Sequence, residues 1–504
     1  MAQLTTFPAR RRVTRPFSGR RIAQFRTGKL WRQSRPRWQL VLSKAPLAAL
    51  RKFTLSRTLL AVFGVPLLLY IWREVRRDVL IIDPITVPKE WSESGMTPEA
   101  MAALVGDKMR QIETSTQTIM RKDQPTMVQD SAPSIELPGT RFDLKALVDI
   151  TRTVFGIYPR HVAGVVVLAP DPSSELEGDA TKRTAKATIF VVEGRKMSAA
   201  VSVDVPADDV SGLVQTVAEA ALGQVNPYVL AVYDKNHRQY GAAIDLAMAI
   251  RRNPSTGAHY RAAATNLIGN VLSDEGKNDE AIAKYQEALA IDPKLVIAWT
   301  SWGSVLDDEK RYDEAIAKFQ KAIEIDRNYV VPWYNWGTTL THENRYDEAL
   351  TKYQKAVIID PNYADAWNGL GNTLYAEKKY GEAIAKYQKA TEVDPDDAHA
   401  WNNWGLALCQ EKRYYEADGK LENAVGIDPN FTDAWNALGI ALYREQRYYE
   451  ATAMFQRATE LDPGYAVAWN NWGLALEQIG QAARAEKKFA RARALGYPRK
   501  LPGG

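Results

Sequence analysis

The sequence predicts a mainly α-helical protein: an α-solenoid of helix-turn-helix repeats, preceded by a small α+β domain and a single N-terminal transmembrane helix. Three observations support this prediction. The phrase AWNNWGLAL stands at 400–408 and again at 468–476, and variants at 366–374 and 434–442 reduce the period to 34 residues. β-branched segments between 161 and 205 predict strands, and an uncharged apolar run occupies 58–72.

The composition allows several domains and excludes a disulfide scaffold. A chain of 504 residues has room for two or three domains, and 46% apolar residues can supply their cores. There is one cysteine, Cys409, which is expected to be a benign small residue. Residues 1–57 hold 15 Lys and Arg and no Asp or Glu, so they contribute +15 to a formal net charge of +5, and the rest of the chain carries −10. A basic tail, 1–52, therefore precedes an acidic body.

Residues 53–77 are predicted to be a transmembrane helix and its flank. The apolar run at 58–72 rises about 22 Å as a helix, short of a hydrocarbon core of about 30 Å. Starting at Phe53 lengthens it and includes Arg57, whose long side chain can reach the interface. Because the tail is basic and acid-free, the N-terminus is expected in the cytoplasm. The expected location is a bacterial inner membrane that residues 53–72 span once, with the repeats in the periplasm.

A second interpretation of the N-terminus remains open. An Arg-rich, acid-free segment is also typical of an organellar transit peptide, whose removal would leave a soluble organellar scaffold. The arginine spacing of the tail shows no defined binding module, so no specific nucleic-acid partner is expected.

A small α+β domain is predicted at 139–225, after a linker at 78–138 that holds one helix at about 97–120. Apolar spacing predicts helices at 142–155 and 211–222. The strands are expected at 161–168, 187–192 and 199–205, with Gly194 in a hairpin turn between the last two. This order of elements indicates a mostly antiparallel sheet.

The function of this domain is expected to be that of a spacer or a partner-binding module. It shows no nucleophile–base pair, phosphate-binding glycine loop or ligand cluster. The five histidines of the chain stand far apart and lack metal-ligand spacing, so no metal, no cofactor and no enzymatic activity is expected. The alternative is an enzyme within 139–225 that uses the repeats to recruit its substrate.

Residues 296–329 illustrate one repeat. Trp299 and Trp302 lie on one face of a first helix, where they are expected to be buried against the neighbouring repeats. Gly303 is expected to let the second helix approach closely. Most repeats end in Asp-Pro, and proline stops the second helix.

This unit closely resembles the tetratricopeptide repeat, in which a large residue, Leu, Gly and Tyr mark the first helix and Ala, Phe, Ala and Pro mark the second. The resemblance covers 262–497 as seven contiguous repeats. A degenerate repeat with an insertion is expected at 226–261, where Leu230 replaces the glycine, and a short tail follows at 498–504. Edge repeats are usually atypical.

The resemblance implies a superhelix whose inner wall is lined by the other face of each first helix. Asparagines recur on that face, as in the repeats of O-linked N-acetylglucosamine transferases, although no catalytic domain of that kind is expected to follow. They imply a groove that pairs with the backbone of an extended peptide, because an amide both donates and accepts. The implied groove residues are Asn335, Asn368, Asn372, Asn402, Asn403, Asn436, Asn470 and Asn471. The alternative is that some of them only cap or brace neighbouring helices. Together with the predicted anchor at 53–72, the resemblance therefore implies a membrane-anchored scaffold for a protein or extended peptide, of unspecified oligomeric state.

One second helix departs from the pattern of the others. At the position of Ile316 and Ile384, a later repeat holds Asp418, and Gly419 follows it. Glycine costs about 1 kcal/mol relative to alanine inside a helix, and aspartate is a poor helix former. Residues 412–427 are therefore expected to be the least protected internal segment of the repeats.

Overall fold

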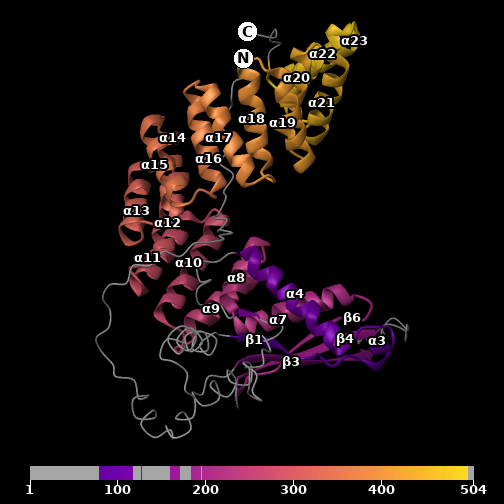
Figure 1. The fold of residues 1–504 in the computed structure, drawn as a ribbon, viewed down its shortest axis with the longest axis vertical. Helices are drawn as coiled ribbons and strands as arrows, with labels where there is room; N and C mark the ends of the chain where they lie inside the picture. The colour runs from indigo at the N-terminus through magenta and orange to yellow at the C-terminus, as the bar shows by residue number, and fades with distance from the viewer. Residues whose placement is uncertain (1–78, 117–125, 128–158, 171–182, 194–195, 498–504) are drawn as a thin grey trace, which may run out of the picture. The chain divides into compact units, whose positions relative to one another are not determined.

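The computed structural model describes residues 79–116, 126–127, 159–170, 183–193 and 196–497. They form two compact units that divide between Asn253 and Pro254 (Figure 1). The predicted transmembrane helix at 53–72 lies outside the described residues. Within them, none of the helices is both long and apolar enough to cross a bilayer.

The sheet of the N-terminal unit is built on a long antiparallel pair of strands. β3 (Arg160–Pro170) and β4 (Arg183–Glu193) pair along their whole length. β6 (Val201–Pro206) also runs antiparallel to β4, while β1 (Val79–Ile82) lies parallel to β3. The short strands are β2 (Thr126–Met127), which pairs with β1, and β5 (Lys196–Met197), which pairs with β4.

Helices pack on this sheet through apolar faces. α4 (Pro98–Thr116) and α7 (Val210–Val225) carry apolar side chains every three or four residues, so each buries one face. Val105 of α4 and Leu213 of α7 share a core with Val162 of β3. The Asp209 side chain accepts a hydrogen bond of 2.7 Å from the Gly212 amide and so caps α7. The remaining helices are α3 (Lys89–Glu93), α8 (Pro227–Asn236) and α9 (Tyr240–Arg252).

The N-terminal unit is larger than the domain predicted at 139–225. β3, β4, β6 and α7 lie where strands and a helix were predicted, and α4 falls within the helix predicted near 97–120. The segment 78–138 is nevertheless more than a linker, because β1 joins the sheet and α4 packs on its core. α8, predicted as part of a degenerate repeat, packs on α4 and α7 and buries Val229 in the same core. The predicted helix at 142–155 and the turn at Gly194 lie outside the described residues.

The C-terminal unit is an array of paired helices (Figure 1). The first helices are α10 (Ala258–Asp274), α12 (Val296–Asp308), α14 (Val330–His342), α16 (Ala364–Ala376), α18 (Ala398–Gln410), α20 (Thr432–Arg444) and α22 (Ala466–Gln478). The second helices are α11 (Asn278–Ile291), α13 (Tyr312–Ile325), α15 (Tyr346–Ile359), α17 (Tyr380–Val393), α19 (Tyr414–Ile427), α21 (Tyr448–Leu461) and α23 (Ala482–Ala494). Each repeat contributes one of each.

The two helices of a repeat approach closely at the glycine of the first helix. A Cβ atom on Gly371 would lie 2.5 Å from Cε1 of Tyr387, and one on Gly439 would lie 2.5 Å from Cε1 of Phe455. Any side chain there would push the helices apart. The expected role of these glycines follows directly from this geometry.

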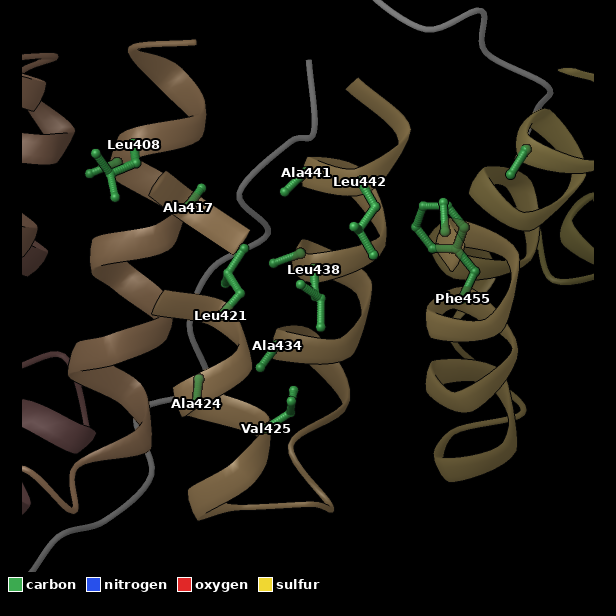
Figure 2. Packing of buried hydrophobic residues seen from close by; sticks show 14 of the residues in the cluster. Leu408, Ala417, Leu421, Ala424, Val425, Ala434, Leu438, Ala441, Leu442 and Phe455 are labelled. Carbon is green, nitrogen blue, oxygen red and sulfur yellow. The ribbon is translucent and has the colours of Figure 1, made fainter. Parts of the chain in front are cut away.

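A continuous core runs between the helix pairs. Figure 2 shows Leu408 of α18, Leu421 of α19, Leu438 of α20 and Phe455 of α21 in one cluster. Successive first helices also touch one another, from α10 and α12 to α20 and α22, whereas successive second helices touch less. The array therefore curves toward its first helices.

The tryptophans are less buried than expected. Trp472 is 6% exposed, but Trp299, Trp302, Trp401 and the others of the repeats are only half-buried. They cover the edge of the core, and the two rings of a repeat stack, as for Trp299 and Trp302 with centroids 5.8 Å apart. Their large rings reach past the helix pair, so part of each faces solvent.

Candidate functional site

The eight predicted asparagines lie on the first helices α14 to α22, and several of them are inaccessible. Asn402, Asn403, Asn436 and Asn470 are between 2% and 6% exposed. Asn335, Asn368, Asn372 and Asn471 are half-buried. The prediction that all eight line an open groove is therefore too broad, because a position beside the tryptophan can turn toward the next first helix.

The asparagines bridge neighbouring first helices. Asn403 Nδ2 on α18 donates to Asn368 Oδ1 at 3.2 Å and to Asn372 Oδ1 at 3.1 Å, both on α16. Asn471 Nδ2 on α22 donates to Asn436 Oδ1 on α20 at 3.1 Å. The alternative reading, that some of these side chains brace neighbouring helices, therefore describes Asn403 and Asn471. A bracing amide is held in one orientation, and this fixes the side chains around it.

A similar hydrogen bond joins two first helices nearer the start of the array, and its acceptor is a hydroxyl group. Asn335 Nδ2 on α14 donates to Ser304 Oγ on α12 at 3.0 Å. Asn335, Asn403 and Asn471 occupy one repeat position, just before a tryptophan. The same position thus reaches back to the preceding first helix in three repeats.

Second-helix tyrosines were missed as part of this network. Tyr387 OH donates to Asn372 Oδ1 at 2.9 Å, so Asn372 accepts from both α17 and α18. In the first repeat Tyr285 OH donates to Asn270 Oδ1 at 3.0 Å. Burial raises the pKa of Tyr387 well above its ordinary value, so its hydroxyl stays a donor.

The hydrogen bond between a second-helix tyrosine and a first-helix polar residue can be anticipated from the sequence. Repeats with a tyrosine at this second-helix position hold a polar residue opposite it, as for Thr338 and Tyr353 at 3.1 Å. In the last three repeats Leu421, Phe455 and Phe489 take the tyrosine position, and the opposite residues are apolar. These are Leu406, Ile440 and Leu474. The first-helix face is therefore polar in the early repeats and more apolar in the late ones.

Asn402 and Asn470 differ from the bridging asparagines. Each comes from one of the two identical AWNNWGLAL phrases and is at most 3% exposed. The Oδ1 atom of each is buried and has no hydrogen-bond partner in the structure. A buried acceptor without a donor costs about 1–3 kcal/mol. Because each atom is inaccessible in this structure, an N–H group from outside the repeats reaches it only after neighbouring side chains move.

Lysines cover the tryptophan pairs and were also missed. Lys318 Nζ on α13 lies 3.9 Å from the Trp302 ring centre, and Lys488 Nζ on α23 lies 3.3 Å from that of Trp472. Burial lowers the pKa of Lys488, because its ammonium group loses water above the rings. These cation–π contacts join the two helices of a repeat.

Three features of the described part of the chain bear on possible chemistry. It contains no cluster of His, Cys, Asp and Glu that could hold a metal ion. A hollow of 660 Å³ on the N-terminal unit is lined by Trp91, Met96, Leu104 and their neighbours, with Asp107 as its one titratable side chain. Burial raises the pKa of Cys409 to about 12, so its thiol stays protonated at neutral pH.

Comparison with family models identifies the repeats. A model described as TPR repeat matches residues 269–308, 337–378 and 371–412, and two models described as tetratricopeptide repeat match 297–329 and 432–465. These stretches of the chain are therefore tetratricopeptide repeats, as the sequence indicated. No curated protein matches the chain.

Solved structures of repeat proteins are similar to part of the chain. YrrB, described as a TPR protein with an unusual peptide-binding site, is 29% identical over 35% of this chain and 91% of its own, with a TM-score of 0.32. A MamA protein is 23% identical over 33% of this chain and 91% of its own, with a TM-score of 0.31. MamA 41-end from Desulfovibrio magneticus RS-1 is 21% identical over 32% of this chain and 93% of its own, with a TM-score of 0.31.

Proposed function

We propose that this chain is a non-catalytic, membrane-anchored scaffold whose first-helix asparagines bind an extended segment of a protein partner. Tetratricopeptide repeats support a role in protein–protein interaction, since stacked repeats present long binding surfaces. The finer parts of the proposal are the asparagine surface and the membrane anchor.

The unpaired acceptors of Asn402 and Asn470 are the observation that supports the asparagine surface. Because both atoms are buried, the proposed binding requires neighbouring side chains to shift when a partner binds. The two acceptors recur at one repeat position, two repeats apart, and each is beside a bridging asparagine of the same helix. The bridges hold this row of amides in place before a partner arrives. Binding then costs less side-chain entropy than it would with free asparagines. Backbone amides of an extended segment supply the missing donors whatever its side chains are.

The test separates binding from bracing. The full chain in detergent serves as bait, and the captured partner is identified by mass spectrometry and reduced to its shortest binding peptide. Asn402→Ala with Asn470→Ala should weaken binding by about 0.5–1.5 kcal/mol for each lost hydrogen bond, with helix content unchanged. The matched pair Asn403→Ala with Asn471→Ala should lower the melting temperature as well, because it removes the bridges.

Unchanged affinity in both double variants would contradict the asparagine surface. Binding would then belong to the second helices or to the N-terminal unit. A fall in affinity only in the Asn403 and Asn471 variant would assign these residues an indirect, bracing role.

A further inference from the structure

The second helix α19 presents an unusual exposed face. Tyr415 is 83% exposed, and Tyr449 at the same position of the next repeat is 71% exposed. Earlier repeats hold Asp279, Asp313 or Asp347 at this position, which suits a solvated surface. Large apolar side chains left in water together mark interaction surfaces.

Two glycines on the same face make no close packing contact with the described part of the chain. Gly419 and Gly426 are exposed, and a Cβ atom at either would meet nothing within 4 Å. Gly405 on α18 contrasts with them, because a Cβ there would lie 2.5 Å from Leu421 Cγ. Each exposed glycine costs α19 about 1 kcal/mol relative to alanine, with no contact among the described residues to offset it.

Tyr415, Gly419, Glu422 and Gly426 form one row, which we call the α19 row. Their spacing of four, three and four residues keeps them on a single helix face, and all four are exposed. The spacing reads the same in both directions. Two antiparallel copies of α19 therefore bring Tyr415 of each over Gly426 of the other, and Gly419 opposite Glu422. The Tyr415 ring of each copy thus packs against the glycine surface at Gly426 of the other copy, so the contact occurs once at each end of the helix pair.

We propose that a second copy of this chain docks on the α19 row, in a two-fold symmetric contact between antiparallel α19 helices. Such a contact uses the same patch on both copies. Lys412 precedes the helix and Asp428 follows it, whereas Arg413 is already paired with Glu416 at 2.7 Å. Antiparallel pairing places these opposite charges together at both ends, and it also opposes the two helix dipoles. Tyr449 of α21 extends the apolar part of the contact.

Cross-linking of the full chain in detergent tests the geometry. In a Cys409→Ser background, Glu422→Cys places a thiol close to its own copy across the two-fold axis. The matched control is Gln388→Cys, the same exposed position on α17. Rapid disulfide formation between two chains is expected for Glu422→Cys and not for Gln388→Cys. Equal cross-linking of both, or of neither, would overturn the proposal.

Sedimentation of the full chain in detergent tests the energetics. Gly419→Arg should raise the dimer dissociation constant by at least about tenfold, because the arginine fills the place of the second copy. Ala385→Arg, at the same position of α17, should leave it unchanged. Circular dichroism should show intact helices in both variants, since arginine is a better helix former than glycine and nearly as good as alanine. A monomeric unmodified chain, or a dimer that Gly419→Arg does not weaken, would refute the contact.

Discussion

At the scale of single residues, each repeat depends on one close approach between a glycine and a large side chain. The partner is a tyrosine, a phenylalanine or, in one repeat, Leu421. Tyrosine adds a hydrogen bond to the first helix, as Tyr387 does with Asn372. The contact thus fixes both the distance between the helices and the orientation of an amide on the first helix.

Gly371→Ala tests this contact against a matched glycine in the same repeat. The added methyl would overlap the Tyr387 ring, so we expect the free energy of unfolding to fall by about 1–3 kcal/mol. Gly381→Ala has open space at its Cβ and should instead raise it by up to about 1 kcal/mol. Denaturant titration measures both. If both variants raise the free energy of unfolding, helix propensity, and not the close approach to Tyr387, determines the effect of Gly371→Ala.

An ion pair between first helices makes stability depend on pH. His342 Nδ1 on α14 lies 3.2 Å from Asp307 Oδ2 on α12, and its hydrogen bond to that carboxylate raises the pKa of His342 above 6.5. Because the folded pKa is the higher one, the stabilisation is complete below about pH 6.5 and is lost as the pH rises through the folded pKa.

The melting temperatures of the unmodified chain and of His342→Gln should therefore differ most in mild acid. The difference should shrink as the pH is raised toward about 8.5. A difference that stays constant across this range would mean that packing against Tyr312, and not the charge on His342, provides the stability.

At the scale of elements, α19 is the exceptional second helix. The residue that breaks its pattern, Asp418, gains a partner in the next repeat: Arg447 Nη1 lies 2.6 Å from Asp418 Oδ2. Its Oδ1 atom is buried without a hydrogen-bond partner, so the ion pair replaces an apolar contact only in part. That 412–427 is the least protected internal segment stays a prediction. The Asp418–Arg447 ion pair opposes it, because this contact stabilises α19.

Hydrogen exchange measures the weakness of α19 directly. Amides of 414–425 should exchange faster than those of 380–391, because Gly419 and Gly426 lower the helix propensity of α19. The comparison is made in a Tyr415→Ser variant, so that self-association does not protect the helix. Equal rates would show that the Asp418–Arg447 pair fully compensates. If α19 exchanges faster than α17, Gly426→Ala should slow the exchange of α19. If the two helices exchange equally fast, Gly426→Ala should change the rate little.

At the scale of the whole molecule, the chain combines a sheet-containing unit with an array of helical repeats, and the last described repeat differs from the internal ones. The last second helix, α23, places Glu486 and Arg493 where internal repeats bury Ile316 and Ile323, and the two form an ion pair of 2.6 Å. A polar pair at this position gives the final repeat a solvated outer face.

The proposed membrane topology is also a property of the whole chain. Residues 53–72 should span the membrane once, with the basic tail in the cytoplasm and the repeats outside it, because short basic segments resist translocation. Protease added to intact spheroplasts should digest the repeats and spare a tag on residues 1–52. Full protection of the repeats would reverse the orientation, and a mature N-terminus beyond residue 72 would contradict the anchor.

The sequence by itself determined the helical array, since a period of 34 residues with glycine and alanine at fixed positions is typical of stacked helix pairs. It also placed three strands and α7, whose apolar spacing is local. Only the tertiary structure decided where side chains on the polar face of a first helix point. Helical periodicity assigns Asn402 and Asn403 to a face, but the distance to α16 decides that Asn403 bridges it while the Oδ1 of Asn402 is left without a partner. The same holds for β1, whose four residues carry too little local pattern to reveal a strand before β3 lies beside it. Contacts between segments distant in the chain fix these features, and no local pattern encodes such distances.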